Sequence, residues 1–456
     1  MAKLLRFGLP LALLVLVSGA FALSTRAGAS DGIAFTVTPL NTPNGDSEPA
    51  ISIGADGTMA ITGLPWLRNS ASDFATRLWT GSFGSTPALQ GGIDTGLIKP
   101  GSTVVGALDA DVDIGSTGRL HASTLLGFAN PTSKLTTLGI SAITCPSPKS
   151  AGFSVASCTS KIIDTAGADR QWITSDGARV WIAYHDSADS DLIHVQLSTD
   201  DGFTWRKVGD PIVGQGGATG SATFNNRQGP IVADPFTHNV YDVYAAGEAS
   251  IQKGTTANFN NVYVSRSTNG GVSWTANLVY HAPLNTRLNN IFPSLAVDPI
   301  NGSLYAVWTD THHVLISKST DQGSSWSPAQ AVSEAPATTT VMPWVAAYNG
   351  AVDVVYYGTT ASSNLDTSAV WFVYMARSTT GGSTYSQLQV SPDSNHSGVV
   401  CLNGTGCAPG TRNLLDLFEV AIDPANGRAG VIYTDDAHTV DSKGNPLPQI
   451  VLAQQN

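Results

Sequence analysis

One eight-residue pattern recurs four times in the second half of the chain. The first copy is Ser198-Thr-Asp-Asp-Gly-Phe-Thr-Trp205, and further copies begin at Ser267, Ser319 and, in a weaker form, Ser378. Each copy is a short polar stretch between two apolar runs. A motif that returns at a roughly constant spacing is the signature of a repeat architecture, so the fold must be built from several similar units.

The residue types in this octet predict a tight hairpin turn. The Ser at position 1 and the Asp or Asn at position 3 can accept hydrogen bonds from nearby backbone N–H groups. The Gly at position 5 suits a positive φ angle, and the aromatic ring at position 8 can be buried beside the turn. One carboxylate per turn is too few for a calcium site. These structural positions are Ser198, Asp200, Gly202, Trp205, Ser267, Asn269, Gly271, Trp274, Ser319, Asp321, Gly323 and Trp326.

The octet resembles the Asp-box, or BNR repeat, Ser-x-Asp-x-Gly-x-Thr-Trp, of the sialidase superfamily of β-propellers. The resemblance covers residues 198–385 and implies an all-β propeller. It is less informative about activity, because Asp-boxes also occur in propellers without sialidase chemistry.

A second repeat runs through the whole chain and consists of an apolar run, a turn rich in Asp, Pro or Gly, and another apolar run. Its turns end at residues 57, 118, 177, 238, 302, 350 and 427. This spacing suits one four-stranded unit per interval, with the second repeat as the first hairpin of the unit and the octet as its last. We therefore expect a seven-bladed β-propeller. The sialidase family proper has six blades, so a six-bladed propeller with an insertion is the alternative.

The two ends of the chain suggest how the propeller closes. The run 448–453 would be the third strand of the last unit, after which the chain stops, and the alternating run 33–40 could supply the missing outer strand. We expect a single propeller domain over residues 33–456, preceded by a flexible bridge at 23–32.

Residues 1–22 have the features of a signal peptide. Lys3 and Arg6 precede the apolar run Leu9–Val17, and Ala20-Phe21-Ala22 offers a cleavage site. The run is too short to span a bilayer, so no transmembrane anchor is expected. Four cysteines suit an exported chain, either secreted, periplasmic or on the cell surface. Three pairings are possible, and proximity favours Cys145 with Cys158 and Cys401 with Cys407.

The charge of the chain limits its partners. The formal net charge is −11, which argues against a nucleic-acid partner. Only 12% of residues are charged, so a gathering of charged residues at one kind of position is informative. We expect a monomer.

Charged residues gather just before the first strand of each unit. Because strands alternate in direction, these positions share a face with the ends of the second strands, and the octets lie on the other face. The candidates for ligand binding are Glu48, Asp169, Arg170, Arg227, Arg287 and Arg412, and the candidates for catalysis are Asp109 and Asp111. Tyr184, Tyr357 and Tyr433 follow second strands, so any of them could be a tyrosine nucleophile on the same face.

The resemblance to sialidases suggests roles for these residues. In that family three arginines hold the substrate carboxylate, a Tyr activated by a Glu is the nucleophile, and an Asp is the acid/base. By position, the four arginines would form the clamp, and Asp109 or Asp111 would be the acid. Tyr357 is one of the three candidate nucleophiles. The chain has no Arg-Ile-Pro-like motif near its first unit, and its glutamates lack a recognisable nucleophile context.

These features lead us to expect an exported, sialidase-like propeller that recognises glycans, in particular acidic ones, at its axial mouth. One alternative is an exo-glycosidase of sialidase type that hydrolyses terminal sialic or related acidic sugars. A second alternative is a protein-binding scaffold, in which each Arg pairs with an Asp of the neighbouring blade. No cofactor is expected, although Asp109 and Asp111 could hold a calcium ion.

Overall fold

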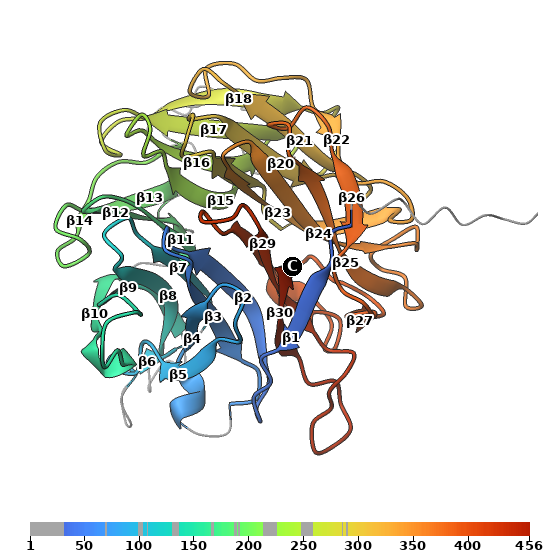
Figure 1. The fold of residues 1–456 in the computed structure, drawn as a ribbon, viewed down its shortest axis with the longest axis horizontal. Coiled ribbons are helices and arrows are strands. Elements are labelled where there is room, and N and C mark those ends of the chain that lie inside the picture. Colours follow the sequence, from blue (N-terminus) through green and yellow to red (C-terminus); the bar gives the residue numbers. More distant parts are fainter. Residues whose placement is uncertain are drawn as a thin grey trace, which may run out of the picture.

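The computed structural model describes residues 32–68, 71–98, 104–106, 108–129, 136–165, 168–186, 189, 192–212, 226–247, 259–284, 286–288 and 291–456. The predicted signal peptide and all of the predicted bridge except residue 32 lie outside these ranges. Seven antiparallel sheets surround one axis (Figure 1), so the chain is a seven-bladed β-propeller, as the repeat spacing predicts. The described residues include no helix long and apolar enough to cross a membrane.

The first three blades follow each other along the chain. Blade 1 contains β2 (Asp46–Ile53), β3 (Thr58–Pro65), β4 (Arg77–Ser82) and β5 (Ala88–Gly92), with the 3-10 turn η1 (Ala71–Phe74). Blade 2 contains β6 (Val104–Val105), β7 (Ala110–Ile114), β8 (Leu120–Ala129), β9 (Thr136–Cys145) and β10 (Thr159–Asp164), with η2 (Val155–Ser157). Blade 3 contains β11 (Ala168–Asp176), β12 (Arg179–Asp186), β13 (Leu192–Ser198) and β14 (Arg206–Lys207).

The remaining blades repeat the same order. Blade 4 contains β15 (Asn226–Ala233), β16 (Val240–Ala246), β17 (Asn261–Ser267) and β18 (Thr275–His281), and blade 5 contains β19 (Ser294–Val297), β20 (Leu304–Thr309), β21 (Val314–Ser319) and β22 (Gln330–Ala331). Blade 6 contains β23 (Thr339–Tyr348), β24 (Ala351–Thr359), β25 (Val370–Ser378), β26 (Ser386–Gln389) and β27 (His396–Ser397). Blade 7 contains β28 (Glu419–Ile422), β29 (Ala429–Asp435), β30 (Gln449–Gln455) and β1 (Phe35–Pro39), after the 3-10 turn η4 (Gly404–Gly406).

The octets join the third strand to the fourth in blades 3, 4, 5 and 6. In the first octet, Ser198 Oγ accepts the Gly202 N–H at 2.9 Å, and Asp200 Oδ1 accepts the Thr204 N–H at 2.7 Å. Gly202 has a φ angle of 87°, and Trp205 Nε1 donates back to its carbonyl at 2.9 Å. The serine bond recurs in the other three octets, so the octet is a self-contained hairpin clamp.

Large rings fill the space between and within the blades. Trp172, Trp181, Trp308 and Trp371 are fully buried, so they belong to the core of the blades. Burial of such rings is a major source of stability.

The seventh blade takes its outer strand from the start of the domain. Strand β1 pairs antiparallel with β30, with Phe35 opposite Gln455 and Pro39 opposite Val451. Beyond the strand, Leu40 is buried, and its N–H donates to the Ile450 carbonyl at 2.8 Å. The two ends of the domain therefore share one sheet, and β30 has no open edge along this stretch.

We predict that deletion of residues 33–40 lowers the melting temperature, because it removes the β1 ladder and exposes the surface that Leu40 covers. Burial of one leucine side chain contributes about 1.5–3 kcal/mol, and the lost backbone pairing adds to this. Differential scanning calorimetry would measure the change, with a chain shortened only to residue 32 as the control. An unchanged melting temperature would show that the last blade does not depend on β1.

Candidate functional site

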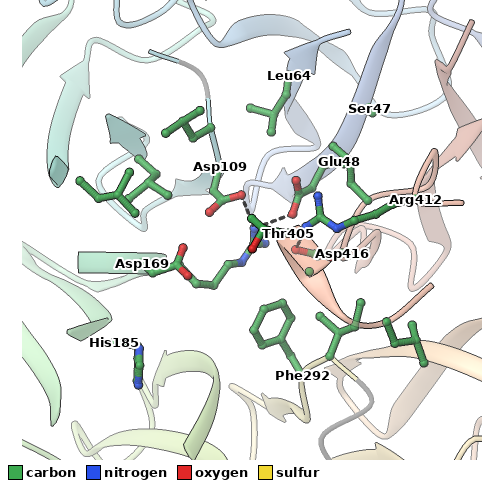
Figure 2. A pocket seen from close by; sticks show the side chains of 18 of the residues that line it. Ser47, Glu48, Leu64, Asp109, Asp169, His185, Phe292, Thr405, Arg412 and Asp416 are labelled. Atoms are coloured by element: carbon green, nitrogen blue, oxygen red, sulfur yellow. Dashed lines mark hydrogen bonds and ion pairs between the residues drawn. The ribbon is translucent and has the colours of Figure 1, made fainter. Parts of the chain in front are cut away.

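A cavity of about 630 Å³ lies at the mouth of the propeller axis (Figure 2). Its walls come from the residues that precede the first strand of a blade and from those at the end of the second strand. Lining residues with charged or aromatic side chains are Glu48, Trp66, Arg68, Asp109, Asp169, Arg170, His185, Arg227, Phe292, Arg412 and Asp416. The cavity therefore occupies the face that strand direction predicts for ligands, and its wall includes most of the charged candidates.

Irregular backbone at the start of the first strands turns two charged side chains toward this cavity. Arg170 is an extra residue in the pairing of β11 with β12, and Glu48 lies within a register shift between β2 and β3. Both have positive φ angles, 52° for Arg170 and 51° for Glu48. Non-glycine residues rarely adopt this conformation, and bulges next to functional sites commonly re-aim a side chain. The two unfavourable backbone conformations therefore lie where the charged side chains of Arg170 and Glu48 meet.

The Arg170 guanidinium joins three blades at the floor of the cavity. Its Nη1 lies 2.7 Å from Glu48 Oε1 of blade 1 and 3.3 Å from Asp109 Oδ1 of blade 2. The guanidinium lies over the ring of Trp172 at 4.3 Å and that of Phe292 at 5.3 Å. Arg170 and Glu48 are only 5% and 1% exposed, so this cation and its partner interact in a weakly screened environment.

Burial opposes ionisation of the two acids that flank Arg170. It raises the pKa of Asp109 to about 7, against the attraction of the Arg170 charge. Burial and the neighbouring Asp109 charge also hold the pKa of Glu48 well above its usual range. Two carboxyl groups this close do not titrate independently, so the pair loses its protons one after the other. Near neutral pH the floor of the cavity can hold one carboxylate and one carboxylic acid.

The other arginines of the cavity wall differ in whether a carboxylate pairs with them. Arg412 is ion-paired to Asp416, four residues along the same connection. Arg227 is exposed, and its guanidinium lies 5.6 Å from the centre of the Phe259 ring. Within the described part of the chain, Arg227 has no carboxylate partner. It is therefore a cation of the wall that remains available to an anionic ligand.

The structure does not bring every candidate into the cavity. Asp111 lies below the floor, where Oδ2 accepts the Ile173 N–H and Oδ1 accepts the Val112 N–H, both at 2.8 Å. It thus joins the first strands of blades 2 and 3. Arg287 is exposed but does not line the cavity.

The candidate tyrosines are also outside the cavity. Tyr357 is fully buried against Phe418, and its hydroxyl accepts the Thr434 N–H at 3.1 Å. Tyr184 and Tyr433 are likewise buried in the blades. Among the described residues, no tyrosine lines the cavity. A tyrosine nucleophile has no place in this site, because second-strand residues that alternate inward pack into the core between blades.

Several lining residues escaped the sequence analysis. Trp66 and Arg68 follow the second strand of blade 1, and Phe292 precedes the first strand of blade 5. These positions obey the same rule as the predicted ones, so applying the rule to every blade and to aromatic residues would have found them. Residues 402–405 had no such signal, because they belong to a long irregular connection.

Metal ligation was a minor alternative at this site. Among the residues that the structure describes, there is no group of three or more His, Cys, Asp or Glu side chains arranged to hold a metal ion. Asp111 uses its oxygens for backbone N–H groups, and Asp109 faces a guanidinium. Both oxygens of Asp111 and one oxygen of Asp109 therefore already have partners.

No family model matches the chain, and no curated protein resembles it in sequence. Similar solved structures include a protein of unknown function from Dyadobacter fermentans, with 11% identity over 92% of this chain and 99% of the other and a TM-score of 0.48. They also include a GH93 α-L-arabinofuranosidase of Fusarium graminearum (14% identity, 71% and 92% coverage, TM-score 0.46) and the Trypanosoma rangeli sialidase (11%, 93% and 60%, 0.43). At these levels of similarity we infer no activity from them.

We predict that Arg170→Ala lowers the free energy of unfolding by about 3–5 kcal/mol at pH 8, because it leaves the buried acids Glu48 and Asp109, of which Asp109 is ionised at this pH, without their shared cation. The loss should be smaller at pH 5, where both acids, whose pKa values are raised in the folded state, are protonated and uncharged. Urea unfolding of the wild-type protein and of Arg170→Ala would measure the loss at each pH.

The exposed Arg206 of β14 provides a matched control. Arg206→Ala should change the free energy of unfolding little at either pH. Equal losses for Arg170→Ala at pH 5 and pH 8 would show that repulsion between Glu48 and Asp109 is not what Arg170 relieves.

Proposed function

We propose that the axial cavity binds a sugar residue that carries a carboxylate. The observation that carries this proposal is Arg227, an exposed guanidinium in the wall without a carboxylate partner in the described part of the chain. Arg170 and Arg412 are already paired with internal acids. A guanidinium presents a planar set of donors that matches a carboxylate, and its position over the Phe259 ring leaves these donors free to bind it.

The rest of the wall suits the remainder of a sugar. A volume of about 630 Å³ lies within the range of small-molecule sites and can hold one residue together with part of the next. Asn226, Gln228 and Asp169 provide polar groups for hydroxyls, while Trp66 and Phe292 provide apolar surface for a sugar face. The disulfides Cys145–Cys158 and Cys401–Cys407 are in keeping with an exported glycan-binding protein.

We predict that Arg227→Ala weakens binding of N-acetylneuraminic acid or glucuronic acid about 10- to 100-fold, the usual worth of hydrogen bonds to a charged group. Arg227→Lys should lose less affinity than Arg227→Ala, because lysine keeps the positive charge, although it lacks the planar donor pair. Isothermal titration calorimetry would measure both, with Arg206→Ala as the control. Binding of galactose as tight as that of the acids, or an unaffected Arg227→Ala variant, would refute the proposal.

Hydrolysis of the bound glycoside is a second candidate, and it rests on the pair Glu48 and Asp109. Since both carboxyl groups contact the same Arg170 nitrogen, these oxygens are no more than about 6 Å apart, a limit that admits the spacing of about 5–5.5 Å in retaining glycosidases and lies below that of inverting ones. Asp109 would give its proton to the glycosidic oxygen as the bond to the anomeric carbon breaks, while Glu48 forms an ester with that carbon. Water would then replace Glu48 and give a proton back to Asp109. This route needs no tyrosine.

We predict that product release from a sialoside or glucuronide falls as the pH rises through about 7, because Asp109, whose pKa is raised to about 7 by burial, then loses the proton that it donates. Asp109→Asn and Glu48→Gln should each abolish turnover without removing Arg227. A fluorogenic-substrate assay across pH 5–9 would measure the rate of product release for the wild-type protein and both variants. Tight binding with no turnover at any pH would leave recognition as the whole function.

A further inference from the structure

The chain contains six Asn-Gly pairs, all within the described residues. They begin at Asn44, Asn269, Asn301, Asn349, Asn403 and Asn426. In such a pair the backbone nitrogen of the glycine can attack the side-chain carbonyl carbon of the asparagine, because glycine has no side chain to hinder the approach. The attack needs an asparagine amide that is free to turn and a glycine N–H that no acceptor holds. Local contacts therefore decide which pair reacts in the folded protein.

Five of the six pairs are restrained by hydrogen bonds. In four of them the glycine N–H already has an acceptor at 2.8–3.1 Å. For Gly45, Gly302, Gly350 and Gly427 these acceptors are, in the same order, the Thr42 carbonyl, the Asp298 carbonyl, Asp298 Oδ2 and the Asp423 carbonyl. In the fifth pair the amide is held instead, since Asn269 Oδ1 accepts the Ser273 N–H at 2.9 Å and Asn269 Nδ2 donates to Ser273 Oγ at 2.8 Å.

The pair of Asn403 and Gly404 has neither restraint. The Asn403 side chain is exposed and makes no capping hydrogen bond to the turn η4 that follows it. Among the described residues, no partner holds the Asn403 amide and no acceptor receives the Gly404 N–H. This pair therefore meets both conditions for the attack.

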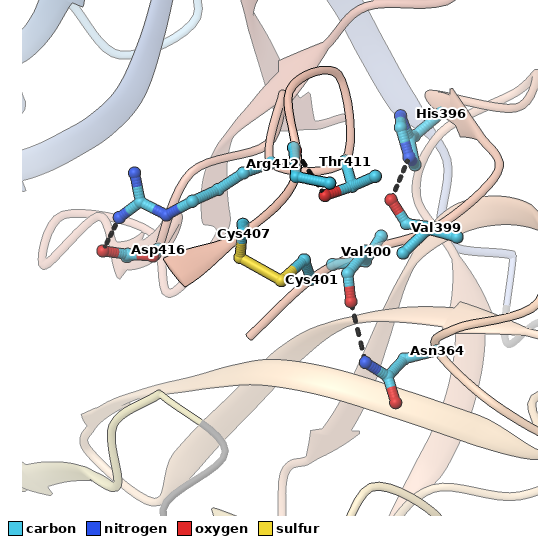
Figure 3. The surroundings of a disulfide bond; sticks show 10 residues. Asn364, His396, Val399, Val400, Cys401, Cys407, Thr411, Arg412 and Asp416 are labelled. Atoms are coloured by element: carbon cyan, nitrogen blue, oxygen red, sulfur yellow. Dashed lines mark hydrogen bonds and ion pairs between the residues drawn. A yellow bond between two sulfur atoms is a disulfide. The ribbon is translucent and has the colours of Figure 1, made fainter. Parts of the chain in front are cut away.

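The backbone around Asn403 also has less to lose when it turns. Closure of a ring onto Gly404 requires rotation about the ψ angle of Asn403, which breaks the 3.0 Å bond from the Gly406 N–H to the Asn403 carbonyl. Four of the other pairs lie in turns that connect two paired strands, where the same rotation would also disturb the strand pairing. The disulfide between Cys401 and Cys407 closes the loop around Asn403 (Figure 3), so the residue stays in the cavity wall after it has reacted.

We propose that Asn403 is a site of spontaneous deamidation, which places a carboxylate in the wall of the axial cavity. The Gly404 nitrogen gives its proton to water and forms a bond to Asn403 Cγ. The bond from Cγ to Nδ2 breaks, and the nitrogen takes up a proton from solvent and leaves as ammonia. Water then opens the cyclic imide at one of its two carbonyl carbons and leaves aspartate or isoaspartate at position 403.

The new charge would oppose the ligand proposed for this cavity. Asn403 lines the cavity together with Arg227, the proposed carboxylate-binding residue, and the wall already includes Asp169 and Asp416. A further negative charge repels a sugar carboxylate, more strongly where the walls exclude water. The protein would thus lose affinity for an acidic sugar as it ages. This consequence rests on the proposed function, whereas the modification itself follows from the contacts of the loop.

The first test follows all six pairs in one sample of the intact protein at pH 8, by mass spectrometry of its peptides. We expect Asn403 to react about 10-fold faster than each of the other five, because those must break one or two further hydrogen bonds. Water labelled with oxygen-18 should leave its label at position 403. In guanidinium chloride, which removes the turns, the six pairs should react at similar rates. Reaction of Asn403 no faster than the others in the folded protein, or a lead that persists after unfolding, would overturn the proposal.

The second test measures what the new charge does to binding. Asn403→Asp should bind N-acetylneuraminic acid or glucuronic acid about 2- to 10-fold more weakly than the fresh wild-type protein, and added salt should narrow the difference. Asn403→Gln keeps a neutral amide that closes a ring far more slowly, so its affinity should match the wild type and stay constant on storage. Unchanged affinity in Asn403→Asp would overturn the proposed effect on binding. Absence of acid binding by fresh wild-type protein would instead overturn the cavity proposal and leave the mass-spectrometric result standing.

Discussion

The ion pair between Arg170 and the acids of two other blades is the interaction on which the site depends. A buried guanidinium is costly unless it is paired, and Arg170 is paired with Glu48 and Asp109 and lies against two aromatic rings. The positive charge of Arg170 in turn allows the carboxyl groups of Glu48 and Asp109 to lie close together at the buried floor of the cavity. The unusual backbone at Arg170 and Glu48 is understandable as the cost of directing both side chains to one point.

The same strands that carry the site also hold the propeller together. Three acids two residues apart, Asp109 just before β7 and Asp111 and Asp113 within it, all contact blade 3. Their partners are, in the same order, the Arg170 guanidinium, the Ile173 N–H and the Ser175 hydroxyl. Only the first of the three reaches the cavity. A similar bond joins the ring at its closure, since Glu419 of blade 7 accepts the Ile51 N–H of blade 1 at 2.8 Å. Position along the strand therefore decides whether an acid also reaches the cavity or lies wholly between two blades.

Much of this arrangement could be predicted from the sequence, because it follows from repetition. The turns of the second repeat and the octets predicted the blade number and the face on which the cavity lies, and proximity predicted both disulfides. Asp109 could not be separated from Asp111, because residues two apart on a strand share a face and only depth distinguishes them. Tyr357 was misplaced for a related reason, since an inward residue at the end of a second strand can face either the mouth or the core. Residues 402–405 carry no periodic pattern, so their position in the cavity wall required the structure.

The central claim is that the Arg170 floor and Arg227, which has no carboxylate partner in the described part of the chain, together form a site for an acidic sugar. A crystal structure of the protein soaked with N-acetylneuraminic acid or glucuronic acid tests this most directly. The account predicts the sugar in the axial cavity, with its carboxylate on the Arg227 guanidinium and the Arg170–Glu48–Asp109 contacts intact beneath it. A sugar bound elsewhere on the propeller, or one in the cavity whose carboxylate points away from Arg227, would contradict the account.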